Sequence, residues 1–273
     1  MSRYALVAGN GRFPVLALES AKKLGHEVVA IGIKEEASPE IEPLAARCHW
    51  ISLGELGRLI RILKDEGITE LVFAGQVKHA SIFSAIRPDW RLAKLLASLE
   101  TRNTDALIGG IIRILEQEGV RVLDSTGLLK PLLASLGPMS RRKPTREEEA
   151  DIRYGRRIAN ALAGFDVGQS VVISERACVA VEAMEGTDAA LRRAASLVNG
   201  RPLRLVKVSR RRSHLLFDVP VAGLQTIAVM QETGTTVLAV DAGRTLLLDR
   251  DEMLARADEA DIAVVGYPPE EAP

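Results

Sequence analysis

The sequence has few of the residues that disulfide frameworks and metal clusters require. Its two cysteines, Cys48 and Cys178, lie far apart and lack the spacing of a metal or redox motif. The four histidines are His26, His49, His79 and His214. No Asp-x-His or Asn-His-Glu cluster of the kind used by dinuclear metallophosphoesterases is present. These absences disfavour a disulfide-stabilised domain, a zinc protein and a His-rich metallohydrolase.

The sequence has neither an excess of charge of one sign nor a long apolar run, so neither feature indicates a binding partner. The chain has 36 basic and 36 acidic residues, so its formal net charge is zero and nucleic acid is not an expected partner. No apolar run approaches the roughly 20 residues of a membrane span, so any contact with a membrane should be peripheral. The start Met-Ser-Arg-Tyr lacks a signal-peptide pattern, and we expect a cytoplasmic protein.

Several well-known catalytic motifs are also missing, and one is incomplete. There is no Walker lysine loop, no Gly-x-Ser-x-Gly elbow and no His-Glu-x-x-His helix. The segment from Gly9 to Pro14 resembles a dinucleotide fingerprint, but Pro14 replaces its third glycine, and no acidic residue ends the second strand to hold a ribose. Hydride transfer is therefore disfavoured. Two interpretations of the loop remain: the amides near Gly9 and Gly11 bind a phosphate or ribose, or they form a structural turn.

What the sequence does contain is a regular alternation of strand and helix patterns. In the first half we expect strands at 4–8, 27–33, 70–73 and 121–123, with helices at 14–24, 55–66 and from 104 onward. This order predicts a parallel, Rossmann-like sheet. The second half predicts a helix from 147 to about 163 and strands near Val171, Val179, Leu205, Val237, Leu246 and Ala263.

The segment between the halves has the composition of a linker. Residues 136–145, LGPMSRRKPT, combine glycine, two prolines and three consecutive cations. We therefore predict an α/β protein with an N-terminal Rossmann-like parallel-sheet domain at 1–136, a short linker at 137–146 and a second mixed α/β domain at 147–273.

Two polar turns open helices and are candidate anion sites. One is Thr187 with Asp188, which follows two apolar strands, with Gln169 just before the first of them. The other is Thr104 with Asp105. The first N–H groups of a helix have no partner inside it, and the helix dipole favours an anion there. The alternative is that both turns are ordinary N-caps, for which Thr and Asp are common residues.

Asp218 is the acidic residue best placed to project into a site. It follows the apolar residues 215–217 and precedes Val219 and Pro220, so it interrupts a strand where a proline fixes the bend. The alternative is an aspartate that caps a turn. Asp249 and Asp251 are more simply the acidic start of the last helix. With few histidines available, hydrolysis of a phosphate ester would use carboxylates and a hard cation such as Mg²⁺.

Nine motifs in order give the chain a resemblance to one family. They are AGNGRFP at 8–14, FAGQV at 73–77, NTDALIGG at 103–110, VLDST at 122–126, DIRYG at 151–155, GQSVV at 168–172, VEAMEGTDA at 181–189, FDVP at 217–220 and AGRTL at 242–246. Together they cover nearly the whole chain. In this set and order the sequence resembles the LpxI family of UDP-2,3-diacylglucosamine pyrophosphatases.

The resemblance implies an activity and a set of site residues. It implies two α/β domains that hold a UDP-diacylglucosamine lipid between them. It also implies Mg²⁺-dependent hydrolysis to UMP and 2,3-diacylglucosamine 1-phosphate for lipid A synthesis. Asp218 matches the essential acidic position of the family, as catalytic residue and metal ligand. Asp105, Gln169, Thr187 and Asp188 match motifs that line the substrate cleft. Peripheral contact with the inner membrane fits this substrate, and a homo-oligomer is left open.

One segment departs from the family pattern directly before Asp218. Where we expect Lys-Pro-x-Gln-Asp-x-Arg, the chain has residues 210–216, RRRSHLL, so His214 replaces a carboxylate and Leu216 replaces an arginine. The cations Arg210 to Arg212 either contact phosphate or form a solvated basic loop. This departure keeps a second hypothesis open, a non-catalytic nucleotide or sugar-nucleotide binding protein of the same fold.

Overall fold

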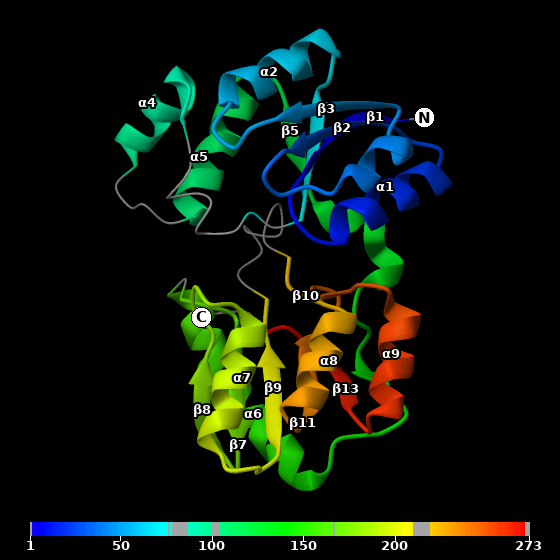
Figure 1. Ribbon diagram of the computed structural model, residues 1–273, viewed down its shortest axis with the longest axis vertical. Coiled ribbons are helices and arrows are strands. Elements are labelled where there is room, and N and C mark those ends of the chain that lie inside the picture. The colour runs from blue at the N-terminus through cyan, green and yellow to red at the C-terminus, as the bar shows by residue number, and fades with distance from the viewer. Residues whose placement is uncertain are drawn as a thin grey trace. The chain divides into compact units, whose positions relative to one another are not determined.

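A computed structural model describes the chain over residues 2–75, 77, 87–99, 104–165, 167–209 and 219–270, with the backbone alone at 104, 105 and 125. The chain folds into two compact units, Met1–Leu129 and Lys130–Pro273. Figure 1 shows a separate sheet in each. Both units are built from alternating strands and helices, which confirms the predicted two-domain α/β class.

The N-terminal unit is built on a five-stranded parallel sheet in the order β3-β2-β1-β4-β5. The strands are β1 Arg3–Ala8, β2 Glu27–Ile33, β3 Arg47–Ile51, β4 Glu70–Ala74 and β5 Arg121–Leu123. The chain moves outward from β1 to β3 and then returns to the other side of β1 at β4. This reversal is the topological switch point at which open parallel sheets bind ligands.

Amphipathic helices cover this sheet. They are α1 Phe13–Lys23, α2 Leu56–Asp65, α4 Trp90–Ser98 and α5 Thr104–Gln117, with 3₁₀ segments η1 Pro39–Leu44 and η2 Ser125–Leu132. Fully buried side chains come from strands and helices alike, as with Leu6, Ile31 and Leu71 against Leu18 and Leu63. The strands are apolar on both faces because helices pack on both, as parallel sheets require.

The C-terminal unit has a mixed six-stranded sheet in the order β6-β13-β11-β9-β7-β8. Strands β9 Leu203–Lys207, β11 Thr235–Asp241 and β13 Ala263–Tyr267 are parallel. Strands β6 Gly137–Pro138, β7 Ser170–Ser174 and β8 Ala177–Val181 run antiparallel to their neighbours. A parallel pair, β10 Val221–Ala222 with β12 Leu246–Leu247, forms a small separate sheet.

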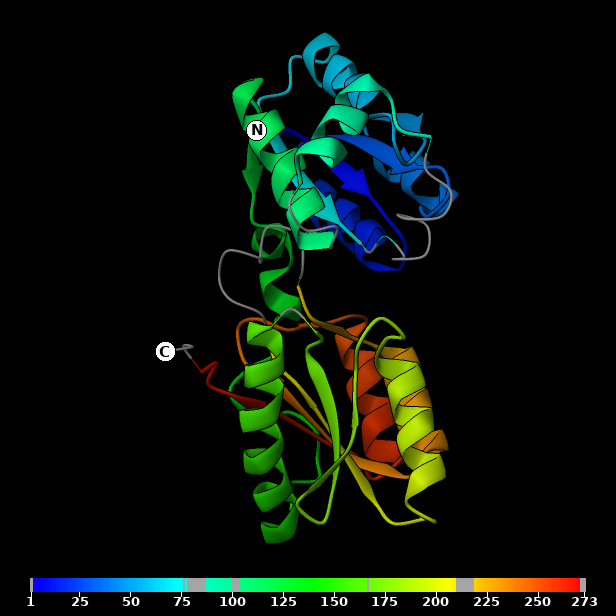
Figure 2. The same ribbon diagram turned by 90° about the vertical axis from the view of Figure 1, so that its left-hand side faces the viewer.

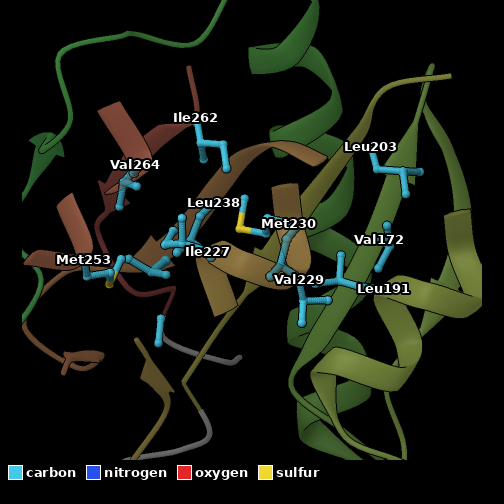
Figure 3. Packing of buried hydrophobic residues seen from close by; sticks show 14 of the residues in the cluster. Val172, Leu191, Leu203, Ile227, Val229, Met230, Leu238, Met253, Ile262 and Val264 are labelled. Atoms are coloured by element: carbon cyan, nitrogen blue, oxygen red, sulfur yellow. The ribbon is translucent and has the colours of Figure 1, made fainter. Parts of the chain in front are cut away.

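Helices pack on both faces of the C-terminal sheet, as the second view shows (Figure 2). Helix α6 Arg146–Gly164 covers one face, where Ile152 and Ala159 pack on Val171 and Val206. Helices α7 Thr187–Leu197, α8 Leu224–Glu232 and α9 Arg250–Glu259 cover the other. Figure 3 shows part of that second cluster, in which side chains of α7, α8 and α9 meet alternate residues of the strands. This alternation follows the two-residue period of a strand.

The segment expected to be the linker belongs to the fold of the C-terminal unit. Gly137 and Pro138 pair with β13 as strand β6. Thr145 caps α6 in a capping box with Glu148, whose carboxylate also binds Arg142 at 2.7 Å. The compact units therefore divide earlier in the chain, between Leu129 and Lys130. The cluster of proline, glycine and cations forms an edge strand and the start of a helix. Both of these structures favour the same residue types as a linker.

Candidate functional site

The glycine loop of the N-terminal unit lies at the switch point between β1 and β4. Gly9 follows β1, and Gly75 follows β4 with a φ of +88°. A Cβ atom at Gly75 would lie 2.6 Å from the Asn10 carbonyl oxygen and 2.9 Å from the Gly9 carbonyl carbon. The two loops therefore approach each other more closely than any side chain would allow. The motifs at 8–14 and 73–77, far apart in the sequence, therefore contact each other at the carboxyl ends of β1 and β4.

Within this loop the backbone donors are not all free. The Gly9 N–H donates to the Ala74 carbonyl at 2.8 Å, so this hydrogen bond continues the pairing of β1 with β4. Gly11 is exposed and has a φ of +94°. Helix α1 begins at Phe13, and Pro14 takes an early position that needs no hydrogen-bond donor. The Gly9 amide is therefore occupied within the sheet, and Gly11 is the exposed glycine of the loop.

Sequence reasoning missed an acidic residue beside this loop. Glu36 lies three residues beyond β2 and is 9% exposed. Its Oε2 atom accepts a hydrogen bond from Asn10 Nδ2 at 3.3 Å. The dinucleotide pattern expects the acidic residue at the last position of the strand. Here the chain turns back after Ile33, because the Glu36 and Ala37 N–H groups both donate to the Ile33 carbonyl. The two consecutive acidic residues Glu35 and Glu36 after the second strand are the sequence feature that could have indicated this position.

In the C-terminal unit, buried polar side chains gather where the parallel strands end. Lys207 ends β9, Asp241 ends β11, and Ser209 lies two residues past β9. Their exposures are 6%, 1% and 7%. Ser170, which pairs with Lys207 across the sheet, is 2% exposed. Burial of charged groups is costly unless they are paired, so such a group at a strand end is typical of a site and not of a core.

Thr187 contacts two of these side chains, Lys207 and Ser170, and also the buried carboxylate of Glu182. Its hydroxyl donates to Glu182 Oε1 at 2.7 Å and accepts from Lys207 Nζ at 3.0 Å, and Ser170 Oγ lies 3.4 Å away. The expectation that Thr187 or Asp188 caps α7 was wrong, because Gly186 is the N-cap, with a φ of +84° and no side-chain cap. The Thr187 side chain is instead directed toward the buried polar groups.

Glu182 is ionised in this arrangement. Burial would raise the pKa of its carboxyl group, but the Lys207 charge and the surrounding hydrogen-bond donors outweigh burial and lower the pKa. Its main chain is also held tightly. The Glu182 N–H donates to the Ser170 carbonyl at 2.9 Å, and a Cβ atom at Gly168 would collide with the Glu182 carbonyl oxygen. The carboxylate therefore has one fixed position beneath Thr187.

Gln169 and Asp188 are the sequence neighbours of Ser170 and Thr187. The backbone carbonyl of Gln169 accepts from the Val208 N–H at 2.9 Å, which places its side chain beside the end of β9. Its Oε1 atom is buried and has no hydrogen-bond partner among the residues that the structure describes. Asp188 lies in the first turn of α7, where its charge raises the pKa of Arg192 after the larger effect of Glu232. Thr187 therefore lies among the buried polar groups, whereas Asp188 interacts with Arg192 of its own helix.

Asp241 fixes the chain that follows β9. Its Oδ2 atom accepts from the Ser209 N–H at 2.7 Å and from Ser209 Oγ at 2.9 Å, while Oδ1 accepts from Arg156 at 2.7 Å. Arg156 comes from α6 and is 5% exposed. The guanidinium also donates to the Pro268 carbonyl at 2.7 Å and lies over the Tyr267 ring. Residues 209, 241 and 156 form a rigid base directly before residue 210.

The remaining predicted residues lie outside what the structure describes. Asp218, the cations Arg210 to Arg212, His214 and Leu216 fall in the undescribed range 210–218. Asp105 lies in the first turn of α5, where the backbone alone is described. Within the described ranges, no three His, Cys, Asp or Glu side chains form a group that could hold a metal ion. No helix in the same ranges is long and apolar enough to cross a bilayer.

Fold and site together define a class, a two-domain α/β protein with a glycine loop on a Rossmann-like sheet and a buried polar site at a second sheet edge. Comparison with known families makes this specific. Residues 3–132 match the LpxI N-terminal domain and residues 135–265 match the LpxI C-terminal domain. The chain belongs to the LpxI family. It is similar to the UDP-2,3-diacylglucosamine pyrophosphatase LpxI of Caulobacter vibrioides, with 31% identity over 283 aligned residues and 100% of each chain covered.

Similarity to solved structures is weak. A nucleoside-diphosphate-sugar epimerase from Pseudomonas aeruginosa gives a TM-score of 0.28 at 16% identity, covering 44% of this chain and 31% of its own. An N5-carboxyaminoimidazole synthetase from Staphylococcus aureus gives 0.30 at 9% identity, covering 63% and 32%. Scores this low carry no argument about function.

Proposed function

We propose that this chain hydrolyses the pyrophosphate bond of UDP-2,3-diacylglucosamine, giving UMP and 2,3-diacylglucosamine 1-phosphate for lipid A biosynthesis. The observation that carries the proposal is the match along the whole chain to both LpxI domains and to the named Caulobacter pyrophosphatase. A shared domain alone would leave the substrate open. A relative matched from end to end at this identity supports the same reaction.

The physical problem of this reaction is charge. A diphosphate repels a nucleophile, so the site has to bind the phosphoryl oxygens and hold one water in line. The first amides of α7 supply donors at the C-terminal site, and Gln169 has an acceptor without a protein partner in the described ranges. We assign substrate binding to Gln169, Thr187 and Asp188, and to Gly9, Gly11 and Asp105 in the N-terminal unit. Asp218 is assigned the orientation of the attacking water.

Mg²⁺ is part of the proposal through the family resemblance. Both oxygens of Asp241 accept hydrogen bonds from Ser209 and Arg156, whereas Glu182 binds Thr187 through Oε1 and has no partner at Oε2 among the described residues. Mg²⁺ commonly binds through one or two carboxylates together with substrate phosphates. Asp218 is the residue proposed to hold it. When bound, the ion would neutralise phosphoryl charge.

The deciding experiment is release of UMP from purified UDP-2,3-diacylglucosamine by the full chain. We expect turnover with Mg²⁺ and loss of turnover in EDTA, restored by added Mg²⁺. Turnover that is unchanged by EDTA would keep the pyrophosphatase and remove the metal. Tight substrate binding without any UMP release would favour the non-catalytic binding protein and would direct attention to His214 and Leu216.

Replacement of Asp218 tests the catalytic assignment. We expect Asp218→Ala to lower kcat by at least about 100-fold, because loss of a group that acts only in the transition state removes several kcal/mol of stabilisation. Asp251→Ala is the control, since Asp251 is an exposed residue in the first turn of α9. Circular dichroism should be unchanged in both variants. Near-normal turnover in Asp218→Ala would refute the assignment and leave Asp188 or Asp249 as candidates.

We also propose that the protein works in the cytoplasm and meets its lipid substrate by peripheral contact with the inner membrane. The acylated substrate supports this, because its chains partition into a bilayer. Flotation with vesicles of phosphatidylethanolamine and phosphatidylglycerol tests it. Co-flotation that requires substrate in the vesicles is the expected result, and recovery of all protein in the soluble fraction would contradict it.

A further inference from the structure

The buried ammonium group of Lys207 has hydrogen-bonding capacity that the described residues do not use. Lys207 is the last residue of β9 and is 6% exposed. Its Nζ atom donates to Thr187 Oγ1 at 3.0 Å. An ammonium group carries three N–H donors. In the part of the chain that the structure describes, the remaining two have no acceptor.

Another cation on the same strand shows a different arrangement. Arg204 is 8% exposed and lies at the amino-terminal half of β9, with its Nε atom 3.2 Å from Asp151 Oδ2. Asp151 in turn accepts from the Arg176 N–H at 2.7 Å. This is a direct ion pair with a fixed carboxylate, although the Arg204 Nε atom makes no hydrogen bond among the described residues. Among the residues that the structure describes, Lys207 is connected to a carboxylate, Glu182, through the Thr187 hydroxyl.

The indirect contact is informative because buried charge is costly. A buried ammonium is stabilised best by a carboxylate in direct contact, and unused buried donors carry a desolvation penalty. Here the hydroxyl holds the ammonium at the first turn of α7, and two of its donors have no acceptor within the described ranges. The dipole of α7 places further positive potential at the same point. Such an arrangement is poor for stability alone and well suited to a bound anion.

We propose that Lys207 binds a phosphoryl oxygen of the substrate diphosphate, with Thr187 and Glu182 holding its ammonium group in place. The inference rests on the proposed function and names a contact of the same site. Lys207 supplies a full positive charge and point donors, whereas the α7 amides supply fixed directions. Glu182 orients the Thr187 hydroxyl and balances the cation when no substrate is bound.

The test compares Lys207→Met with Arg204→Met, since each removes one buried cation from β9. We measure the affinity for UDP by calorimetry, and kcat and KM with UDP-2,3-diacylglucosamine. Lys207→Met should weaken UDP binding roughly 10- to 100-fold, the range for loss of a charged hydrogen bond. Lys207→Arg should recover part of it. Arg204→Met should lower stability and leave UDP affinity within about 2-fold, because its pair lies away from the strand's carboxyl end.

Glu182→Gln gives a second variant in case Lys207→Met does not fold. Glutamine keeps an acceptor for the Thr187 hydroxyl and removes the negative charge. We expect UDP affinity to stay the same or to increase, since repulsion of the diphosphate is removed. A loss of roughly 10-fold or more, the size expected for removal of a charged hydrogen bond, would mean that the pair is purely structural, and would overturn the proposal.

Failure of this inference is distinct from failure of the proposed function. If the unmutated chain releases UMP and Lys207→Met keeps its UDP affinity and kcat/KM, the inference is wrong and the function stands. If the unmutated chain binds UDP in a Lys207-dependent way without releasing UMP, the phosphate contact stands and hydrolysis does not. If the unmutated chain neither binds UDP nor turns over substrate, both are overturned.

Discussion

The two units end their parallel strands in different ways. In the N-terminal unit the edge at the switch point is made of backbone, with Gly9 and Gly75 packed against each other. In the C-terminal unit the corresponding edge is made of charged side chains, with Lys207 and Asp241 both buried. Strand ends that carry glycine can leave room for a ligand because they have no side chains. A charged edge selects one by offering donors and acceptors that are already fixed.

Charge is also treated differently in the two units. In the N-terminal unit the buried carboxylate Glu66 binds Arg3, Arg47 and His49, whose side chains are 37%, 67% and 34% exposed. In the C-terminal unit Asp241 binds Arg156, and both side chains are at most 6% exposed. Solvent can replace a lost partner in the first case but not in the second. The same substitution should therefore cost more in the C-terminal unit.

The largest expected effect on stability is that of Asp241→Ala. It leaves the Arg156 guanidinium buried without its carboxylate and frees Ser209, and we expect a loss of about 3–5 kcal/mol in the free energy of unfolding. Urea unfolding followed by far-UV circular dichroism measures both units. Both tryptophans of the chain, Trp50 and Trp90, are in the N-terminal unit, so their fluorescence reports that unit alone.

We expect the circular dichroism transition to move to lower urea while the tryptophan transition stays in place. Asp251→Ala is the control and should cost within about 1 kcal/mol, since Asp251 is exposed in the first turn of α9. An Asp241→Ala chain as stable as the unmutated chain would show that Arg156 has other sufficient partners.

The fold was largely predictable because its strands are apolar and its helices amphipathic. Strands at 4–8, 27–33 and 70–73 and the helix at 55–66 were found within a residue or two. Strand β3 was not found. Its residues include Arg47, Cys48 and His49, and it lies at the edge of the sheet where the side chains are only partly buried. A pattern of burial cannot reveal a strand that is not buried.

The candidate site was predictable only in part, because motifs identify turns but not the side chains beneath them. Thr187 and Ser170, the residue after Gln169, stand in motifs at helix and strand starts, and their hydroxyl oxygens lie 3.4 Å apart. Lys207 stands in none of the motifs, and Glu182 stands in the motif at 181–189 without being distinguished by it. Each is a charged residue at a strand end, which usually marks the point where a strand reaches solvent. Their pairing depends on β7, β8 and β9 being neighbours, which no short segment encodes.

The glycine edge can be tested by adding a single methyl group. Gly75→Ala forces an alanine to a φ of +88° and places its Cβ against the backbone of Asn10 and Gly9. We expect a loss of about 2–3 kcal/mol, from left-handed strain of about 1 kcal/mol and the displacement of backbone. The tryptophan transition in urea should move. Gly11→Ala is the matched control, because its φ is +94° but no atom lies within 4 Å of the added Cβ, so it should lose only the strain energy. Equal losses in the two variants would mean that the close approach of the loops contributes nothing.

The smallest expected effect is that of Glu66→Gln, which tests whether charge in the N-terminal unit is as weakly coupled as its exposure implies. The hydrogen bond from His49, against burial and together with Arg47 and Arg3, lowers the pKa of Glu66 below its usual 4.5. Because the folded pKa is the lower one, the ionised carboxylate stabilises the fold above pH 4.5, and this contribution is lost as the pH falls through the folded pKa. At pH 7 we expect Glu66→Gln to lose about 1 kcal/mol, since the partners are exposed to solvent. The difference from the unmutated chain should shrink as the pH falls below 4.5, because both side chains are then uncharged. Urea titrations followed by tryptophan fluorescence from pH 7 downward measure this directly. A loss at pH 7 as large as that of Asp241→Ala would contradict the contrast between the units, because it would show that solvent does not replace the partners of Glu66.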